Sequence, residues 1–242
     1  MTDEKEPGRA ASAMVTALHW AFDQATSNIP GLGSAEDLAN AHLSRSDGAP
    51  EKAINGLIAW QVGYAGAAGF ITNLGGLITM PVAIPANLAS VLFIQLRMIA
   101  AIAILRGYQV SDPQVRTLVY VCLVGSGAAD LLQEFSVELG RKLATGLIMK
   151  IPGKTLTKIN QAVGFKLVTK AGASGLVNLT RVVPFIGGLV GGGFDAFLTR
   201  GIGTSAKLTF KAIHPDDAED SVARSTTTTI VTSDPGPLPA SE

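Results

Sequence analysis

A run of 44 consecutive residues, from Ala53 to Leu96, contains no charged residue and no histidine. An uncharged stretch of this length must be buried in protein or in lipid over most of its course. Glycine recurs through its first half, although glycine costs about 1 kcal/mol relative to alanine at each interior helical position. Close contact between helix backbones compensates for that cost. We therefore predict tightly packed helices in this run, with glycines at the contacts.

The same pattern returns near the C-terminus, where Pro184 opens a second apolar and glycine-rich segment. Small residues four positions apart lie on one face of a helix and let two helices approach closely. The glycines to which we assign this packing role are Gly63, Gly66, Gly69, Gly187, Gly188, Gly191 and Gly192.

Periodic apolar spacing predicts helices along most of the chain. The strongest prediction covers residues 86–106, which are apolar on nearly every face and precede Gly107. Residues 115–124 are rich in β-branched types, but no second convincing strand is present to pair with them, so we interpret them as helix. Ser34 and Asp37 have the spacing of a capping box at the start of a shorter helix.

These segments predict an all-α fold, a compact glycine-rich domain of about seven or eight helices. The domain is expected to cover residues 11–212. The N-terminal residues 1–10 and the acidic tail 213–242 are expected to be disordered.

Charge is distributed unevenly along a chain whose formal net charge is zero. Residues 141–211 carry 11 basic and 1 acidic residue, a net charge of +10, whereas residues 212–242 carry 1 basic and 6 acidic residues, a net charge of −5. A basic module favours an anionic surface, although such residues also form ordinary solvated faces. The lysines predicted to contact an anionic surface are Lys150, Lys154, Lys158, Lys166 and Lys170.

A helix over residues 154–171 would present four of these lysines, all except Lys150, to a surface. Its apolar face carries Leu156, Ile159 and Val163, with Leu167 one turn further on. Lys154 and Lys158 lie roughly opposite, whereas Lys166 and Lys170 lie beside the apolar face, where long side chains can snorkel. No interleaved aromatic and basic surface is evident, so nucleic acid is a less favoured partner than lipid.

Few residues have the spacing of a catalytic or metal site. Gly153-Lys154-Thr155 ends like a phosphate-binding loop, but Ile148 replaces the first glycine of that motif and no strand precedes it. The three histidines, His19, His42 and His214, lack ligand spacing and are expected at the surface. We assign no catalytic residue, no metal ligand and no cofactor.

The number of cysteines also excludes several kinds of site. Cys122 is the single cysteine, which excludes an intrachain disulfide and a cysteine-cluster metal site. We expect it to be an inert buried thiol. The N-terminus is acidic and polar, without the basic and apolar regions of a secretory signal, so we expect the protein to stay in the cytoplasm.

Four charged residues stand out because they lie inside apolar segments: Arg97, Arg106, Asp130 and Asp195. Buried charges are tolerated mainly when they are paired, so internal ion pairing is the favoured interpretation. The alternative is a site for an anionic ligand or a lipid headgroup around Arg97. The aromatic residues Trp60, Tyr64 and Tyr120 are assigned to the core rather than to a lipid interface.

Three segments together resemble the EcsC family. They are Gly69–Pro85, which contains Asn73-Leu74-Gly75-Gly76; Leu96–Tyr108, which begins Leu96-Arg97; and Val183–Gly203, which contains Phe194-Asp195. The resemblance covers residues 50–212. It implies a bacterial, mostly helical protein related to an ABC-type transport system involved in secretion. Ala83 departs from the pattern, because many members carry an acidic residue there, so no carboxylate role is carried over.

Taken with the charge pattern, the resemblance implies a non-enzymatic, membrane-associated protein that supports envelope transport or secretion. The expected location is the inner face of the cell membrane, and the expected partner is an anionic membrane surface or a membrane protein. Two other interpretations stay open: a hydrolase-like enzyme with an unidentified carboxylate site, and a soluble interaction module that forms homo-oligomers.

Overall fold

A computed structural model describes residues 5–29, 31–65, 86–135, 151–173 and 188–211. Within these ranges, side chains are described except at 5–7, 64–65, 86–90, 170–173 and 188–195. The described residues form eight α-helices, a 3-10 turn and no strand, which confirms the predicted all-α fold. The helices are α1 (Lys5–Thr26), α2 (Ala35–Ser44), α3 (Pro50–Ala65), α5 (Ala86–Leu105), α6 (Pro113–Cys122), α7 (Ala128–Phe135), α9 (Gly153–Ala173) and α11 (Gly188–Thr209).

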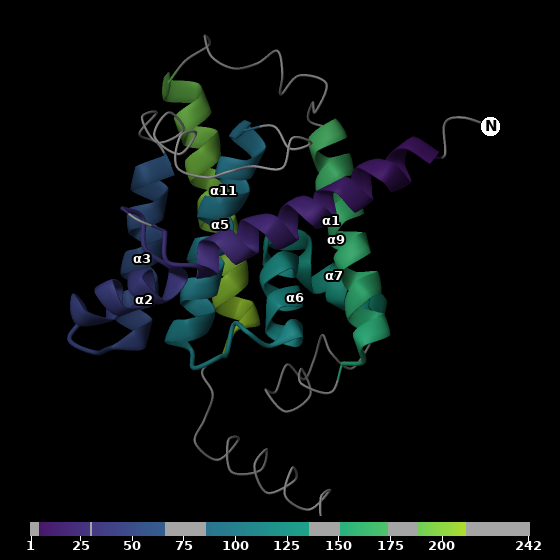
Figure 1. Cartoon of the computed structure of the whole chain (residues 1–242). Coiled ribbons are helices and arrows are strands. Elements are labelled where there is room, and N and C mark those ends of the chain that lie inside the picture. The colour runs from purple at the N-terminus through teal and green to yellow at the C-terminus, as the bar shows by residue number, and fades with distance from the viewer. Residues whose placement is uncertain (1–4, 30, 66–85, 136–150, 174–187, 212–242) are drawn as a thin grey trace, which may run out of the picture.

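Helix α5 forms the centre of the molecule (Figure 1). Helices α1, α2, α3, α6 and α11 all pack against it. Every residue from Met98 to Ala103 is fully buried, as the apolar character of this segment on all faces predicts. Protein rather than lipid therefore covers this part of the helix, which follows the long uncharged run. Within the described residues, no helix is both long and apolar enough to cross a bilayer.

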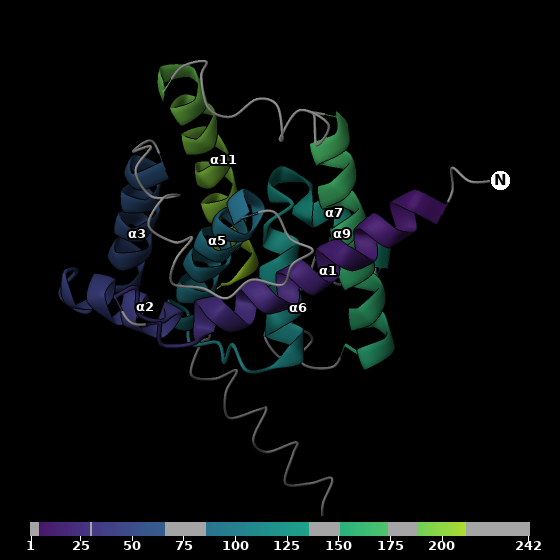
Figure 2. The same cartoon turned by 45° about the horizontal axis from the view of Figure 1, so that its top comes forward.

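Helix α1 runs across the molecule from α9 to α2 (Figure 2). It packs on α5 and on α9, and near its end it contacts α2. It begins at Lys5, so the prediction that helix starts only at residue 11 is wrong. The physical reason is that Pro7 lies in the first turn, where a missing backbone N–H breaks no helical hydrogen bond.

Local sequence signals set several helix ends as predicted. The Ser34 hydroxyl accepts a hydrogen bond from the Asp37 backbone N–H at 3.1 Å, and the Asp37 carboxylate accepts one from the Ser34 backbone N–H at 2.7 Å, which completes the capping box. Gly107, with φ of 89°, ends α5. The Tyr108 N–H then donates to the Ala103 carbonyl at 3.0 Å, which satisfies an otherwise unpaired helix end.

Close helix contacts through glycine occur at positions other than those predicted. A Cβ at Gly164 of α9 would lie 2.8 Å from the Ala11 carbonyl oxygen of α1, and a Cβ at Gly203 of α11 would lie 2.9 Å from the Ile58 side chain of α3. Gly63 is exposed, and no described atom would come within 4 Å of a Cβ built there, so the described residues show no helix contact through this glycine. Helix α3 turns this residue outward, away from the other described helices.

The remaining predicted packing glycines cannot be placed in contacts. Gly66, Gly69 and Gly187 lie outside the described residues. Gly188, Gly191 and Gly192 lie in the first two turns of α11, but their surroundings are outside the described side chains. The predicted tail 213–242 also lies outside the described residues.

Candidate functional site

Arg97 joins the central helix to the turn before α2. Its Nε donates to the Ser34 carbonyl oxygen at 3.3 Å, and its Nη2 donates to the Leu32 carbonyl oxygen. Burial lowers the pKa of Arg97, and the nearby Asp37 carboxylate opposes that shift. The guanidinium group thus satisfies two backbone carbonyls, a structural use that differs from the predicted pairing with a carboxylate of the apolar segments.

The two carboxylates predicted to be its partners are placed differently. Asp130 lies on α7 and is exposed, so its assignment as a buried ion-pair residue is wrong. It lies in the first turn of α7, where a negative charge favours the helix N-terminus without any partner. Asp195 lies in α11, and its side chain is outside the described set.

Arg106 is paired, as the favoured interpretation of the buried charges predicts. Its guanidinium group forms an ion pair with Glu51 of α3, and the Arg106 side chain is only 9% exposed. Lys207 of α11 reaches the same carboxylate at 2.9 Å and also donates to the Asn55 side-chain oxygen at 2.9 Å. Both cations lower the pKa of Glu51, with the Lys207 hydrogen bond contributing most. Glu51 therefore joins α3, α5 and α11.

The outer face of α9 carries part of the predicted basic surface. Leu156, Ile159 and Val163 are buried against the protein, as predicted, and Lys154 and Lys158 are exposed on the opposite side.

The other predicted lysines of α9 contribute less to this face. Lys166 forms an ion pair with Glu134 of α7 at 2.6 Å. Phe165 is 48% exposed beside these residues. Lys150 and the Lys170 side chain are outside the described set.

The outer face of α11 exposes large apolar side chains together with positive charge. Phe197 is 74% exposed and Leu208 is 68% exposed. Their spacing of eleven residues places them on one face, with exposed Arg200 and Thr204 between them. Exposed Lys211 follows the end of the helix. We call Phe197, Arg200, Thr204, Leu208 and Lys211 the α11 outer stripe.

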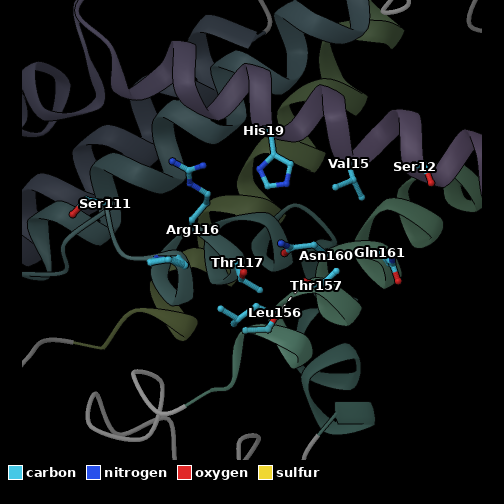
Figure 3. A pocket seen from close by; sticks show the side chains of 12 residues that line it. Ser12, Val15, His19, Ser111, Arg116, Thr117, Leu156, Thr157, Asn160 and Gln161 are labelled. Atoms are coloured by element: carbon cyan, nitrogen blue, oxygen red, sulfur yellow. Dashed lines mark hydrogen bonds between the residues drawn. The ribbon is translucent and has the colours of Figure 1, made fainter.

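A pocket of about 530 Å³ lies between α1 and the first turns of α6 and α9 (Figure 3). His19 of α1 points into it, and Arg116 of α6 borders it (Figure 3). Its other polar lining residues are Ser12, Ser111, Thr117, Thr157, Asn160 and Gln161. No aspartate or glutamate is among the lining residues.

Contacts between α1 and α6 hold the two titratable side chains at this pocket, Arg116 and His19. Arg116 forms an ion pair with Asp23 at 3.3 Å, and its guanidinium carbon lies 4.8 Å from the centre of the Phe22 ring. The His19 Nδ1 lies 3.1 Å from the Tyr120 hydroxyl. Burial, and then the positive charge of Arg116, lower the pKa of His19, whereas Asp23 opposes the shift. The imidazole is therefore neutral at pH 7.

Sequence reasoning missed this pocket. His19 was expected at the surface, but it is partly buried, and His42 is buried beside Trp60 at a ring distance of 5.8 Å. His214 lies outside the described residues. A signal was present in the polar residues that begin the helices at 113 and 153, but only the fold brings those two helix starts next to residue 19.

The aromatic residues and the cysteine that the sequence singled out complete the comparison. Tyr120 is fully buried, as predicted, and Tyr64 has no described side chain. Trp60 is 43% exposed, so its assignment to the core is wrong. Cys122 is buried, and burial raises the pKa of its thiol to about 12, although Thr209 and Ser205 contact it. At neutral pH this thiol stays protonated, as expected of an inert buried cysteine.

Comparison with known proteins identifies the family. No curated protein and no solved structure matches the chain. A model described as the EcsC protein family matches residues 8–212, which covers all of the described helices except the first residues of α1. The chain therefore belongs to the EcsC family.

Proposed function

We propose that this EcsC-family protein is a non-enzymatic, peripheral component of the inner face of the cell membrane, where it supports envelope transport or secretion. The observation that carries the proposal is the α11 outer stripe. Two large apolar side chains, Phe197 and Leu208, stand mostly exposed on the same face as Arg200.

Apolar residues exposed among cations are suited to an anionic lipid surface. Each aromatic or leucine side chain that enters the acyl region removes apolar area from water, worth about 25 cal/mol per Å². Each lysine or arginine near anionic headgroups adds about 1 kcal/mol, an attraction that salt screens. The exposed Lys154, Lys158 and Phe165 of α9 repeat the same combination on a second helix.

The test is vesicle flotation of the full chain. We expect binding to vesicles containing phosphatidylglycerol, weaker binding at high salt, and little binding to phosphatidylcholine vesicles. Replacing Phe197 and Leu208 together with Ser should reduce binding at least tenfold, because about 1.4 kcal/mol corresponds to a factor of ten. Lys154→Gln with Lys158→Gln should reduce it by a similar factor.

Arg45→Gln is the control for loss of a positive charge elsewhere on the surface, because Arg45 is exposed at the end of α2, away from both faces. Deletion of residues 215–242 should strengthen binding, since the acidic tail competes for the same cations. Equal binding to both vesicle types, or equal losses in Arg45→Gln and in the α11 variant, would contradict the proposal. A catalytic carboxylate or an oligomeric interface would then become the better hypothesis.

A further inference from the structure

We propose that the pocket between α1, α6 and α9 binds a phosphate monoester. The proposal does not depend on membrane attachment, because the same chemical group occurs in soluble phosphate esters and in the headgroup of phosphatidic acid. It rests on the composition of the pocket wall, on the two helix ends that meet there and on the partly buried Asn160, whose side-chain oxygen has no hydrogen-bond partner among the described residues.

The described residues that line the pocket offer several hydrogen-bond donors and no carboxylate. Arg116 and His19 supply N–H groups, and the wall carries the hydroxyl groups of Ser12, Ser111 and Thr117. The Thr157 hydroxyl also lines it but already donates to the Gly153 carbonyl oxygen at 3.1 Å. Phosphate oxygens accept hydrogen bonds, and they bind most strongly to arginine, which presents several N–H groups in a planar fork. A wall of this composition favours an oxyanion over a cation.

Two helices start at the pocket, which adds positive potential. Pro113 and Thr117 lie in the first turns of α6, and Gly153 and Thr157 lie in the first turns of α9. The N-cap residue of α6, Asp112, makes no side-chain hydrogen bond to the helix end. Each helix N-terminus carries roughly half a positive charge, and anions bind to such ends.

Asn160 supplies the independent observation. Its side-chain oxygen is buried and has no hydrogen-bond partner among the described residues. The amide points into the pocket, and His19 of α1 points toward it from the opposite wall (Figure 3). Rotation of the amide by 180° would present its N–H₂ group instead. A buried polar atom without a partner is costly, and a bound ligand would remove that cost.

The neighbours of Arg116 shape the expected affinity. Asp23 occupies one edge of the guanidinium group, at 3.3 Å, and the Phe22 ring covers one face. A guanidinium group has five N–H donors, so others remain for a ligand. Asp23 also cancels part of the positive charge, which limits affinity. The volume of about 530 Å³ exceeds that of one phosphate, so the group is expected to carry a small organic substituent.

Titration calorimetry of the purified full chain tests the proposal with glycerol 3-phosphate as the probe. We expect saturable binding, with glycerol giving none at the same concentrations. Asn160→Asp places a carboxylate in the wall at nearly constant volume and should weaken binding about tenfold or more. Arg116→Gln should weaken it similarly, and Arg45→Gln should leave it unchanged. Circular dichroism melts check that each variant is folded.

Vesicles distinguish the two sources of the phosphate group. If the natural ligand is a lipid, Asn160→Asp will also abolish any preference for phosphatidic acid over phosphatidylglycerol. If it is soluble, vesicle binding will be unchanged while glycerol 3-phosphate binding is lost. Both results support the site. Absence of glycerol 3-phosphate binding up to about 10 mM, a Kd range that is already weak, or equal binding by folded Asn160→Asp, would overturn it whatever the vesicle results.

Discussion

At the scale of single residues, Arg97 has the clearest energetic role. It donates to the carbonyl oxygens of Leu32 and Ser34 and so holds the turn before α2 on the central helix. Arg97→Met leaves both carbonyls without this donor and should lower the free energy of unfolding by about 1.5–3 kcal/mol. Urea denaturation gives the value. Arg45→Met, at an exposed position, should change it by less than about 0.5 kcal/mol.

Equal losses in the two variants would show that the Arg97 contacts contribute no stability. The same measurement tests the pairing predicted from sequence alone. Because Asp130 is exposed on α7, the Arg97→Met and Asp130→Leu effects should be additive, with a coupling energy near zero.

Two histidines should make stability depend on pH. Burial is the largest cause that lowers the pKa of both His19 and His42, with Arg116 and Arg45 acting in the same direction. Their folded pKa values thus lie below the ordinary value of about 6.5. As pH falls through 6.5, the unfolded chain binds protons first, so the free energy of unfolding should decrease. The loss levels off once pH is below the folded pKa values.

Urea denaturation between pH 7.5 and pH 5.5 measures this dependence. The double variant His19→Gln, His42→Gln should show a flatter profile over the same range. Stability that is constant or increases on acidification in the unmodified chain would contradict the lowered pKa values of the partly buried His19 and the buried His42.

At the scale of helices, close packing through glycine is specific to position. A Cβ at Gly164 would meet backbone of α1 at 2.8 Å, which cannot move as easily as a side chain. Gly164→Ala should therefore lower stability by about 1–3 kcal/mol. Gly63→Ala is the matched control: its surroundings are open, and higher helix propensity should raise stability by up to about 1 kcal/mol. Thermal melts showing Gly164→Ala as stable as Gly63→Ala would contradict the contact.

The helices themselves could be predicted from sequence, because their signals are local. Each helix end is set by residues within one turn of it: the capping box of Ser34 and Asp37 begins α2, Pro50 begins α3, and Gly107 ends α5. Contacts between helices could not be predicted in the same way. Arg97 was singled out by its apolar surroundings, but its partners lie more than 60 positions away, and only the fold brings them together.

At the candidate sites too, features that depend on neighbouring residues could be predicted from sequence, whereas contacts between distant residues could not. The exposed lysines of α9 follow from helical periodicity and were predicted. Glu51 was missed, since nothing near it in sequence indicates that Arg106 and Lys207 meet its carboxylate. The pocket was missed because it combines three segments whose polar residues are unremarkable when each is taken alone.

At the scale of the whole molecule, the long uncharged run 53–96 and the basic segment 141–211 contribute to different parts of the protein. The last residues of the run, 86–96, form the first half of the central helix α5, against which five other helices pack. Exposed cations and apolar side chains instead lie on the outer faces of α9 and α11. This arrangement agrees with the peripheral attachment proposed above, in which exposed side chains contact the membrane and the core of the protein stays intact.

Cell fractionation tests this peripheral attachment most directly. The full chain, expressed at low level in bacteria, should sediment with the membrane fraction at low ionic strength. High salt or alkaline carbonate should release it, because both weaken attraction between its cations and anionic headgroups. The variant with Phe197→Ser and Leu208→Ser should shift to the supernatant. Recovery of the unmodified chain in the supernatant at low salt, or its retention in the pellet after alkaline extraction, would contradict peripheral membrane attachment.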